Sequence, residues 1–317
     1  MTSSEENGAA QFREVVSRSD LRRMALSLTS DLDRFLEMAR NKNGSNRIQE
    51  LLGRTDDLDT YFFNAILSRF DHIMTDYEAS RVAMQGMRVF SEEKKTEMCS
   101  YVRHHAIPLA CDRSGYAVLK EIINVWSSLG HFFYRDQLLD IVARNALYLG
   151  YDWFSRYHPQ TQLLQNRNHP HPQNPATATA TAAVKPVRPL SYDAHGNYVV
   201  QHVLRLNDLR CTHNVAVSLR GSCFGLSFTK FGSFVVQKLL DTEEEAVMVV
   251  RELVRCDEER LVRLARSDYG NYVLVKALRV MQESNRIDLF WDLANKLRPY
   301  VHLLRGRNVG AFLYWLR

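Results

Sequence analysis

A nine-residue segment occurs three times in the second half of the chain, at a nearly constant interval. The copies are Asp-Ala-His-Gly-Asn-Tyr-Val-Val-Gln at 193–201, Thr-Lys-Phe-Gly-Ser-Phe-Val-Val-Gln at 229–237 and Ser-Asp-Tyr-Gly-Asn-Tyr-Val-Leu-Val at 267–275. Their glycines lie 36 and 38 residues apart. This spacing is typical of an array of helical repeats rather than of a catalytic constellation. The interval therefore predicts a fold in which each repeat stacks on the next.

The same interval continues on both sides of these copies. In the first half, Gly44, Ala79 and Gly115 take the place of the repeated glycine, 35 and 36 residues apart. A last, atypical unit runs from about residue 287 to the end and has Gly310 in that place. A terminal repeat must cover an exposed face, so this departure is expected. The sequence thus predicts an all-α repeat domain over residues 20–317, with six to seven recognisable repeats.

One interval is too long. Gly115 and Gly196 lie 81 residues apart, about 45 more than one period, and the excess coincides with 153–190, which is rich in Pro, His, Gln and Ala-Thr pairs. Because Leu-Gly-Tyr-Asp at 149–152 resembles Leu-Ser-Tyr-Asp at 190–193, we predict a low-complexity, disordered insertion between the first and second helices of the fourth repeat. A linker between two domains is the alternative, and the repeats on both sides favour the insertion. Residues 1–19 are polar, and we expect a flexible lead there.

Composition and charge narrow the class of protein. Hydrophobic residues make up 45% of the 317 residues, and no stretch reaches about 18 apolar residues. The polar start lacks the charged and apolar segments of a signal peptide, so we expect a soluble, cytoplasmic protein with no membrane contact. The net charge of +5 suits an anionic partner. One basic stretch without acids lies at the C-terminal end and contains Lys296, Arg298, Arg305, Arg307 and Arg317.

No catalytic or metal site is predicted. The five cysteines are odd in number and form no Cys-x-x-Cys pair, so we interpret them as reduced thiols rather than disulfides or zinc ligands. His104 and His105 are adjacent and point to different helix faces, and His169 and His171 lie in the Pro-rich stretch, so neither pair is expected to bind a metal. No P-loop, Gly-x-Gly-x-x-Gly or Ser-His-Asp spacing is present. We expect neither enzyme activity nor a cofactor.

Each copy has the pattern of an amphipathic helix, and its glycine is interpreted as permitting the turn before that helix. The buried face has apolar residues at i, i+1, i+4 and i+5, which in the first copy are Val199, Val200, Val203 and Leu204. On the other face, Asn197 and Gln201 are neighbours, with Tyr198 beside them. Paired amides can hydrogen-bond the Watson–Crick edge of an unpaired base, and one ring per repeat can stack on it. In one repeat alone, solvated amides and a packed ring would be the favoured explanation of the pattern, whereas three copies in the same order favour base recognition.

The Gly-Asn-Tyr-Val-Val-Gln and Gly-Ser-Phe-Val-Val-Gln segments at this period resemble the Pumilio (PUF) family of single-stranded RNA-binding proteins. The resemblance covers 20–317 outside the insertion and is strongest over 190–280. It implies a right-handed superhelical crescent of three-helix repeats, whose second helices line a concave RNA-binding face. It also implies binding to mRNA 3′ untranslated regions, with translational repression or mRNA decay through recruited repressor or deadenylation factors. Members are not enzymes, and we expect a monomer.

Carried over position by position, the family's base code implies uracil for Asn197, Tyr198 and Gln201, and adenine for Ser233, Phe234 and Gln237. Asn271 and Tyr272 imply uracil, although Val275 stands where a Gln is usual and cannot hydrogen-bond. Family members bind RNA antiparallel to the chain and typically read 5′-UGU with their C-terminal repeats. Here Gln237 lacks the carboxylate that accepts from guanine, so we predict a preference for 5′-UAU over 5′-UGU.

The first and third repeats carry weaker codes. Ser45 and Gln49 of the first repeat imply adenine, although Asn46 between them is a poor stacker. In the third repeat Lys120 matches no base code, and we predict a phosphate contact there. Because these codes are weak, a protein-interaction helical-repeat scaffold with weak or no RNA binding is the alternative function.

Two registers are open for the second repeat. The base-facing triplet is either Ser80, Arg81 and Met84 or the triplet one residue later that ends at Gln85. The first register is favoured because it turns Val82, Ala83 and Met87 inward. In that register the guanidinium plane of Arg81 is predicted to stack on a base.

Overall fold

A computed structural model describes residues 19–146 and 189–316 of the chain. Every regular element in these two ranges is a helix, which confirms the predicted all-α class. The predicted lead at 1–19 and the predicted insertion at 153–190 lie almost wholly outside the described residues. Within the described ranges, no helix is long and apolar enough to cross a bilayer.

Residues 19–29 form a helix, and three repeats of three helices follow it. The first repeat comprises α2 (Leu32–Arg40), α3 (Lys42–Leu51) and α4 (Asp56–Ser68). The second comprises α5 (Phe70–Met74), α6 (Tyr77–Val89) and α7 (Glu92–His104). The third comprises α8 (Ala106–Cys111), α9 (Gly115–Ser128) and α10 (Phe132–Asn145).

Four further repeats follow, and the last contains only two described helices. Repeat 4 has the 3-10 helix η2 (Leu190–Tyr192), α12 (Gly196–Arg205) and α13 (Leu209–Leu219). Repeat 5 has α14 (Cys223–Leu226), α15 (Lys230–Leu239) and α16 (Glu243–Arg255). Repeat 6 has α17 (Glu258–Arg266), α18 (Gly270–Glu283) and α19 (Ile287–Leu297). Repeat 7 has the 3-10 helix η3 (Arg298–Leu304) and α20 (Asn308–Tyr314).

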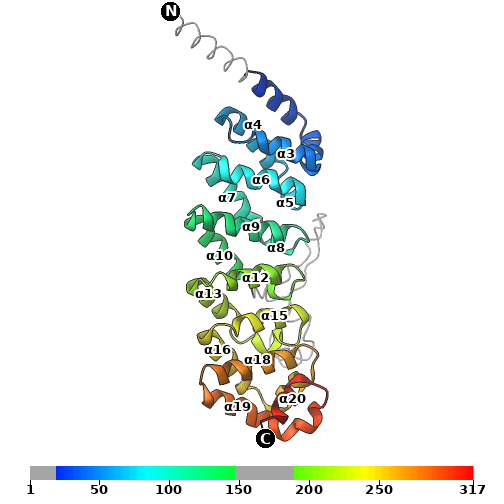
Figure 1. The fold of residues 1–317 in the computed structure, drawn as a ribbon, viewed down its shortest axis with the longest axis vertical. Coiled ribbons are helices and arrows are strands. Elements are labelled where there is room, and N and C mark those ends of the chain that lie inside the picture. Colours follow the sequence, from blue (N-terminus) through cyan, green and yellow to red (C-terminus); the bar gives the residue numbers. More distant parts are fainter. Residues whose placement is uncertain (1–18, 147–188, 317) are drawn as a thin grey trace, which may run out of the picture. The chain divides into compact units, whose positions relative to one another are not determined.

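The chain divides into two compact bodies, Met1–Val142 and Ala143–Arg317, called the N-terminal and C-terminal bodies below. In the N-terminal body, α3 packs against α6 and α6 against α9. In the C-terminal body, α12, α15, α18 and α20 pack against one another in succession (Figure 1). Each body is therefore a stack of repeats whose second helices are neighbours.

Side-chain caps account for where several helices begin. Asp31, Asn41, Asp76, Thr229 and Asp257 each accept a hydrogen bond from a backbone N–H in the first turn of the helix that follows. Such a cap satisfies an amide that has no partner inside the helix and stabilises the helix by about 1 kcal/mol. Polar residues thus mark the starts of these helices.

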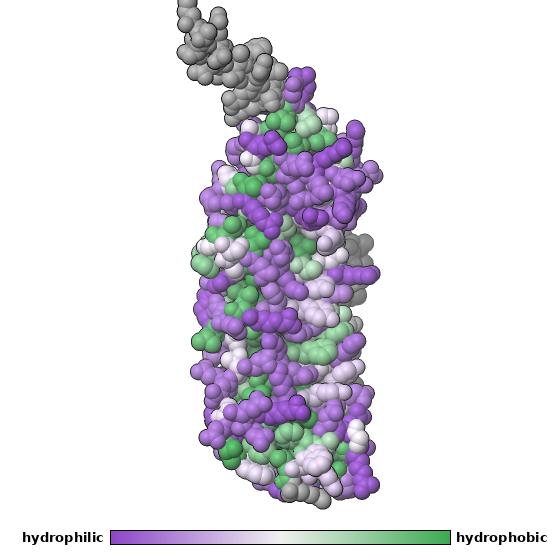
Figure 2. Space-filling model, viewed as in Figure 1, coloured by the Kyte–Doolittle hydropathy of each residue, from purple (hydrophilic) through white to green (hydrophobic). Residues whose placement is uncertain are grey.

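The repeated apolar residues form the core of the C-terminal body, as predicted. Val199, Val200 and Val203 of α12 are fully buried, and so are Val235 and Val236 of α15. Burying a side chain of this size contributes about 1.5–3 kcal/mol each. Hydrophilic residues cover most of the visible surface in Figure 2.

The repeated glycines have a different role from the one expected. None has a positive φ angle; Gly196 and Gly270 are the first residue of their helix, whereas Gly232 is the third. A Cβ atom built on Gly232 would lie 2.6 Å from the carbonyl oxygen of Leu226 in the preceding helix. The same close approach, to the residue six positions earlier, recurs at Gly44, Gly115, Gly196, Gly270 and Gly310. The glycines are therefore needed for close packing of the first helix on the second, not for the turn.

The C-terminal boundary predicted for the insertion is wrong by at least one residue. Leu190 was assigned to the insertion, yet it begins η2 and is fully buried. The backbone N–H of Ser191 donates to the carbonyl oxygen of Ala146, at 3.2 Å. The first helix of repeat 4 is therefore formed by residues at 190–192, and it is hydrogen-bonded to Ala146.

Candidate nucleic-acid interface

Three aromatic side chains occupy the same register position on successive second helices. Tyr198, Phe234 and Tyr272 are 43%, 44% and 54% exposed, whereas the two residues after each are buried. The helices that carry them, α12, α15 and α18, pack in succession, so the rings lie on one face of the C-terminal body. Exposed rings at repeated spacing can stack on successive bases of a single strand. We call this face, with its polar neighbours, the reading face.

The polar residue before each ring is anchored below the surface. Asn197, Ser233 and Asn271 are buried, although the sequence analysis placed Asn197 on the presented face. The Asn197 amide nitrogen donates to the carbonyl oxygens of Asp193 and Ala194, at 2.8 and 2.9 Å. These bonds fix which end of the amide is oxygen. A base contact by Asn197 stays a prediction. Because the Asn197 amide is held in place, it can have a second role.

That second role is to orient Gln201. The Gln201 Nε2 donates to the Asn197 Oδ1 at 2.8 Å, which turns the Gln201 carbonyl oxygen the other way. Arg205 Nη2 approaches that Oε1 atom at 3.4 Å. The amide edge of Gln201 therefore has a defined order of donor and acceptor, which a base edge can match.

Repeat 5 has the same arrangement, but the shorter side chain of Ser233 stands at the position of Asn197. The Ser233 hydroxyl donates to the carbonyl oxygen of Lys230 at 2.9 Å. Gln237 is half-buried and has no hydrogen-bond partner in the part of the chain that the structure describes. Its amide is therefore available to a ligand, beside the exposed ring of Phe234.

Repeat 6 departs from this arrangement. Asn271 is anchored like Asn197, with its Nδ2 donating to the carbonyl oxygens of Ser267 and Asp268 at 2.9 and 3.0 Å. Val275 is nearly buried where Gln201 stands in repeat 4. The Asn271 Oδ1 instead accepts a bond from Asn308 of the next repeat, at 3.2 Å.

Repeat 7 contributes residues that the sequence analysis missed. Phe312 and Trp315 lie two and five residues after Gly310, the same offsets at which Tyr198 and Gln201 follow Gly196. Trp315 is 84% exposed. Counting offsets from Gly310 would have found both residues. Asn308 precedes the glycine, and nothing in the repeated pattern marks it.

The two predicted residues of the first repeat, Ser45 and Gln49, are joined by a hydrogen bond, as Asn197 and Gln201 are in repeat 4. Ser45 is fully buried, and its hydroxyl donates to the carbonyl oxygen of Glu78 at 2.9 Å. Gln49 donates through Nε2 to the Ser45 Oγ at 3.0 Å. Repeat 1 thus repeats the anchored order of repeat 4, with a serine in place of the asparagine.

The structure selects the first of the two registers for repeat 2. Val82, Ala83 and Met87 are buried, as that register requires. Arg81 is exposed, and its guanidinium lies 3.4 Å from the Glu78 carboxylate. The predicted stacking contact of Arg81 would compete with this exposed ion pair, which is weak in water.

Lys120 of repeat 3 lies over the aromatic ring of Tyr116. Its ammonium is 5.4 Å from the centre of the Tyr116 ring, within the range of a cation–π interaction. The predicted phosphate contact of Lys120 remains a prediction.

Asp241 forms ion pairs with one lysine of repeat 5 and one lysine of repeat 6. The carboxylate of Asp241 lies 2.6 Å from the Lys238 ammonium and also pairs with Lys276. Burial by itself raises the pKa of Asp241, but the hydrogen bonds from the two lysines outweigh burial, so the pKa is lowered. Lys238 and Lys276 directly follow Gln237 and Val275, so this ion-pair network joins α15 to α18 beside the reading face.

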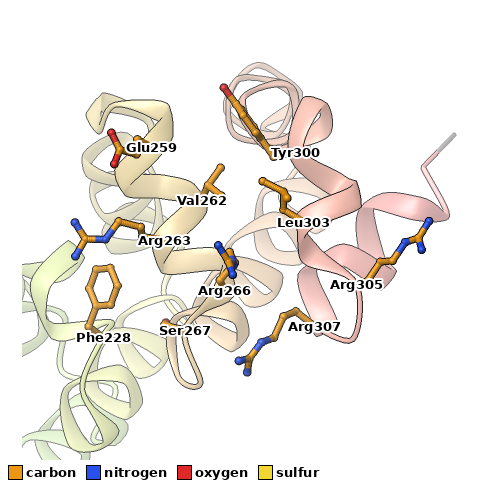
Figure 3. Close-up of a pocket in the computed structure, with 10 residues that line it drawn as sticks. All are labelled: Phe228, Glu259, Val262, Arg263, Arg266, Ser267, Tyr300, Leu303, Arg305 and Arg307. Carbon is orange, nitrogen blue, oxygen red and sulfur yellow. The ribbon is translucent and has the colours of Figure 1, made fainter.

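A basic hollow of about 880 Å³ lies where the first helices of repeats 6 and 7 meet (Figure 3). Val262 and Leu303 supply apolar surface, and four arginines surround it: Arg263, Arg266, Arg305 and Arg307. Arg307 is paired with Asp268 at 2.8 Å. The hollow reaches Ser267, whose Oγ accepts from the first N–H of α18. Its positive charge therefore adjoins the start of a reading helix, a suitable place for phosphate contacts.

Nothing in the described residues has the geometry of a metal centre. No group of three His, Cys, Asp or Glu side chains is placed to hold an ion there. His169 and His171 lie outside the described residues. Burial raises the pKa of the Cys99 thiol to about 12 and that of Cys223 well above its usual value, so both thiols stay protonated near neutral pH.

Comparison with known proteins agrees with this architecture. A family model described as the Pumilio-family RNA binding repeat matches residues 187–208 and 222–254. Two Arabidopsis thaliana relatives, pumilio homologs 18 and 19, are each 44% identical to the chain over 313 residues, which is 97% of this chain and 82% of each relative. The chain belongs to the Pumilio family.

Solved structures show the same fold at lower identity. The Puf4 RNA binding domain bound to an HO endonuclease RNA 3′ UTR recognition sequence matches with a TM-score of 0.67 and 20% identity, over 93% of this chain and 80% of that chain. The Puf3 RNA binding domain bound to a Cox17 RNA 3′ UTR recognition sequence matches with a TM-score of 0.54 and 16% identity, over 94% and 72%. These likenesses confirm the predicted repeat solenoid.

Proposed function

We propose that this protein binds single-stranded RNA sequence-specifically through the reading face. The observation that carries the proposal is the recurrence, in three successive repeats, of an exposed ring beside an anchored polar residue. The rings supply stacking energy, about 1–3 kcal/mol per base. The anchored amides supply a fixed donor and acceptor order that distinguishes bases. The activity proposed for the reading face is binding.

The proposed sites are messenger 3′ untranslated regions, and the proposed outcome is translational repression or mRNA decay in the cytoplasm. Two solved PUF relatives are bound to 3′ UTR recognition sequences, which supports the target class. A monomer with one reading face would need recruited repressor or deadenylation factors to act on the message.

The trinucleotide 5′-UAU is the proposed core of the site. Repeats 6, 5 and 4 would read its three bases in that order, because the proposed RNA runs antiparallel to the chain. Gln237 distinguishes this core from 5′-UGU: its amide matches adenine, and it lacks a carboxylate for the two guanine N–H donors.

The test is direct binding of the full chain to short labelled RNAs that contain UAU, UGU or neither, measured by fluorescence anisotropy at several salt concentrations. We expect the tightest binding to UAU and a fall in affinity as salt rises, because phosphate contacts release counterions. Tighter binding to UGU would refute the proposed core. Equal, salt-insensitive affinity for every RNA, or none at all, would refute RNA recognition and favour the protein-interaction scaffold.

A further inference from the structure

We propose that Asn308 of repeat 7 completes the uracil site of repeat 6, in place of the glutamine that repeat 6 lacks. The proposal rests on the proposed RNA-binding function and adds a specificity-determining residue to it. The site it defines takes an unpaired uracil base between repeats 6 and 7. The base-binding site of repeat 6 is then complete, with one of its hydrogen-bonding groups supplied by repeat 7.

The hydrogen bonds of repeats 4 and 6 support this assignment atom by atom. In repeat 4 the Asn197 Nδ2 is held by two backbone carbonyls, and its Oδ1 accepts from the Nε2 of Gln201 at 2.8 Å. In repeat 6 the Asn271 Nδ2 is held by two equivalent carbonyls, and its Oδ1 accepts from the Nδ2 of Asn308 at 3.2 Å. The donor is a primary amide in both cases. Only its place in the sequence differs, since Asn308 lies 37 residues after its partner.

This chain of bonds also sets what the site accepts. Because the Asn271 amide is fixed by backbone carbonyls, its oxygen faces Asn308 and calls for the nitrogen end of that amide. The Asn308 Oδ1 is then left as an acceptor, with one further N–H beside it. Uracil offers a donor at N3 and acceptor carbonyls on either side, which matches this order. Cytosine has an acceptor at N3. In the same position this atom would face the Oδ1 of Asn308, which is also an acceptor, so no hydrogen bond would form there.

The surroundings of Asn308 fit a flat base. Asn308 is exposed and lines a hollow of about 1100 Å³ in the C-terminal body, together with Tyr272, Val275, Phe312 and Trp315. Tyr272 and Trp315 are largely exposed, so aromatic surface comes from both repeats. Val275 cannot hydrogen-bond a base edge, whereas Asn308, which lines the same hollow, carries an amide that can.

Only repeat 7 has an amide side chain, that of Asn308, two residues before its repeated glycine. The residue two places before the repeated glycine, or before Ala79 in repeat 2, is never an amide in the other six repeats: Lys42, Tyr77, Arg113, Ala194, Lys230 and Asp268. The glutamine of repeats 1, 4 and 5 is replaced in the other repeats by Met84, Lys120, Val275 and Trp315, and repeat 6 with Val275 lies directly before the one repeat that carries Asn308. In the proposed site, Asn308 compensates for Val275.

The experiment measures discrimination at the first nucleotide of the UAU core, using RNAs that carry U or C there. The full chain is compared with Asn308→Ala, with Asn295→Ala as a matched control on the exposed surface of α19, and with the double variant Val275→Gln, Asn308→Ala. We expect the wild-type preference for U over C to fall roughly fivefold in Asn308→Ala, the worth of one hydrogen bond. The control should leave it unchanged, and the double variant should restore it.

Three outcomes overturn the proposal while leaving RNA recognition intact. The first is an unchanged U-to-C ratio in Asn308→Ala. The second is an equal loss of affinity for both RNAs, which means that Asn308 only steadies Asn271. The third is a wild-type protein that discriminates at the second and third nucleotides but not at the first. A wild-type protein that binds no RNA overturns the proposed function and this proposal together. Thermal unfolding of each variant verifies that its fold is retained.

Discussion

Replacing Gly232 by alanine tests the role of the repeated glycines. The added Cβ would lie 2.6 Å from the carbonyl oxygen of Leu226, 2.6 Å from the Thr229 Oγ1 and 2.7 Å from a methyl carbon of Leu226. Ordinary contact begins at 3.4 Å, so the neighbours must retreat by about 0.8 Å. Leu226 is fully buried at the end of α14, and it has little room to move.

The net cost follows from two opposing effects. Overpacking of this kind costs about 1–3 kcal/mol. Rotation of Thr229 would relieve part of the clash, but it would remove the cap of α15 and cost about 0.5–2 kcal/mol. The gain in helix propensity from Gly to Ala returns about 0.5–1 kcal/mol. We therefore expect Gly232→Ala to lower the free energy of unfolding by about 1–2 kcal/mol.

Urea unfolding followed by circular dichroism measures this change, with Gly225→Ala as the matched control. Gly225 lies in α14 of the same repeat, and the nearest atom to an added Cβ, the Tyr192 hydroxyl, is 3.7 Å away. We expect this control to be neutral or slightly stabilising, since only the propensity gain applies. If Gly232→Ala is as stable as Gly225→Ala, close helix packing is not the reason for the repeated glycine.

Two further substitutions and one labelling experiment test other parts of the structure. Tyr198→Ala should weaken RNA binding about ten- to hundredfold by anisotropy, since a stacked base is worth about 1–3 kcal/mol; an unchanged dissociation constant would remove Tyr198 from the site. Gln237→Glu should move the preference from UAU towards UGU, because a carboxylate accepts from both guanine N–H donors; competition binding measures this, and an unaltered ranking contradicts it. Burial raises the pKa of Cys99 to about 12, and the thiolate is the reactive form, so a thiol reagent should label Cys99 only on unfolding; because Cys111 and Cys256 are partly exposed, the labelled position is located by peptide mapping, and rapid native-state labelling of Cys99 itself would contradict its burial.

The repeat fold was predictable because it depends on residues close in sequence. The i, i+1, i+4, i+5 spacing of Val199, Val200, Val203 and Leu204 specifies one buried helix face, and the structure buries all four. The 36-residue interval then requires the next helix to pack in the same way. Periodicity also selected the register of repeat 2, where Val82 proved to be buried.

The site was less predictable because its contacts join different turns or different repeats. No pattern in the sequence states that Asn197 is held by the Asp193 and Ala194 carbonyls, so its burial was missed. The pairing of Asn271 with Asn308 spans 37 residues and two repeats. The role of the glycine was predicted wrongly for a similar reason, since its constraint is close contact with the residue six positions earlier rather than its own φ angle.

The arrangement separates affinity from specificity. Rings such as Tyr198 and Tyr272 stand exposed, and in the proposed complex they would gain stacking energy from any base, because every base has a flat face. The amides beneath them are already ordered by backbone carbonyls, so binding costs them little conformational entropy. An unanchored amide could turn over and accept uracil or cytosine alike, whereas one fixed by its neighbour cannot. We therefore propose that the buried asparagine determines base choice through its partner, and that moving this partner from Gln201 in the same helix to Asn308 in the next repeat would preserve the same discrimination.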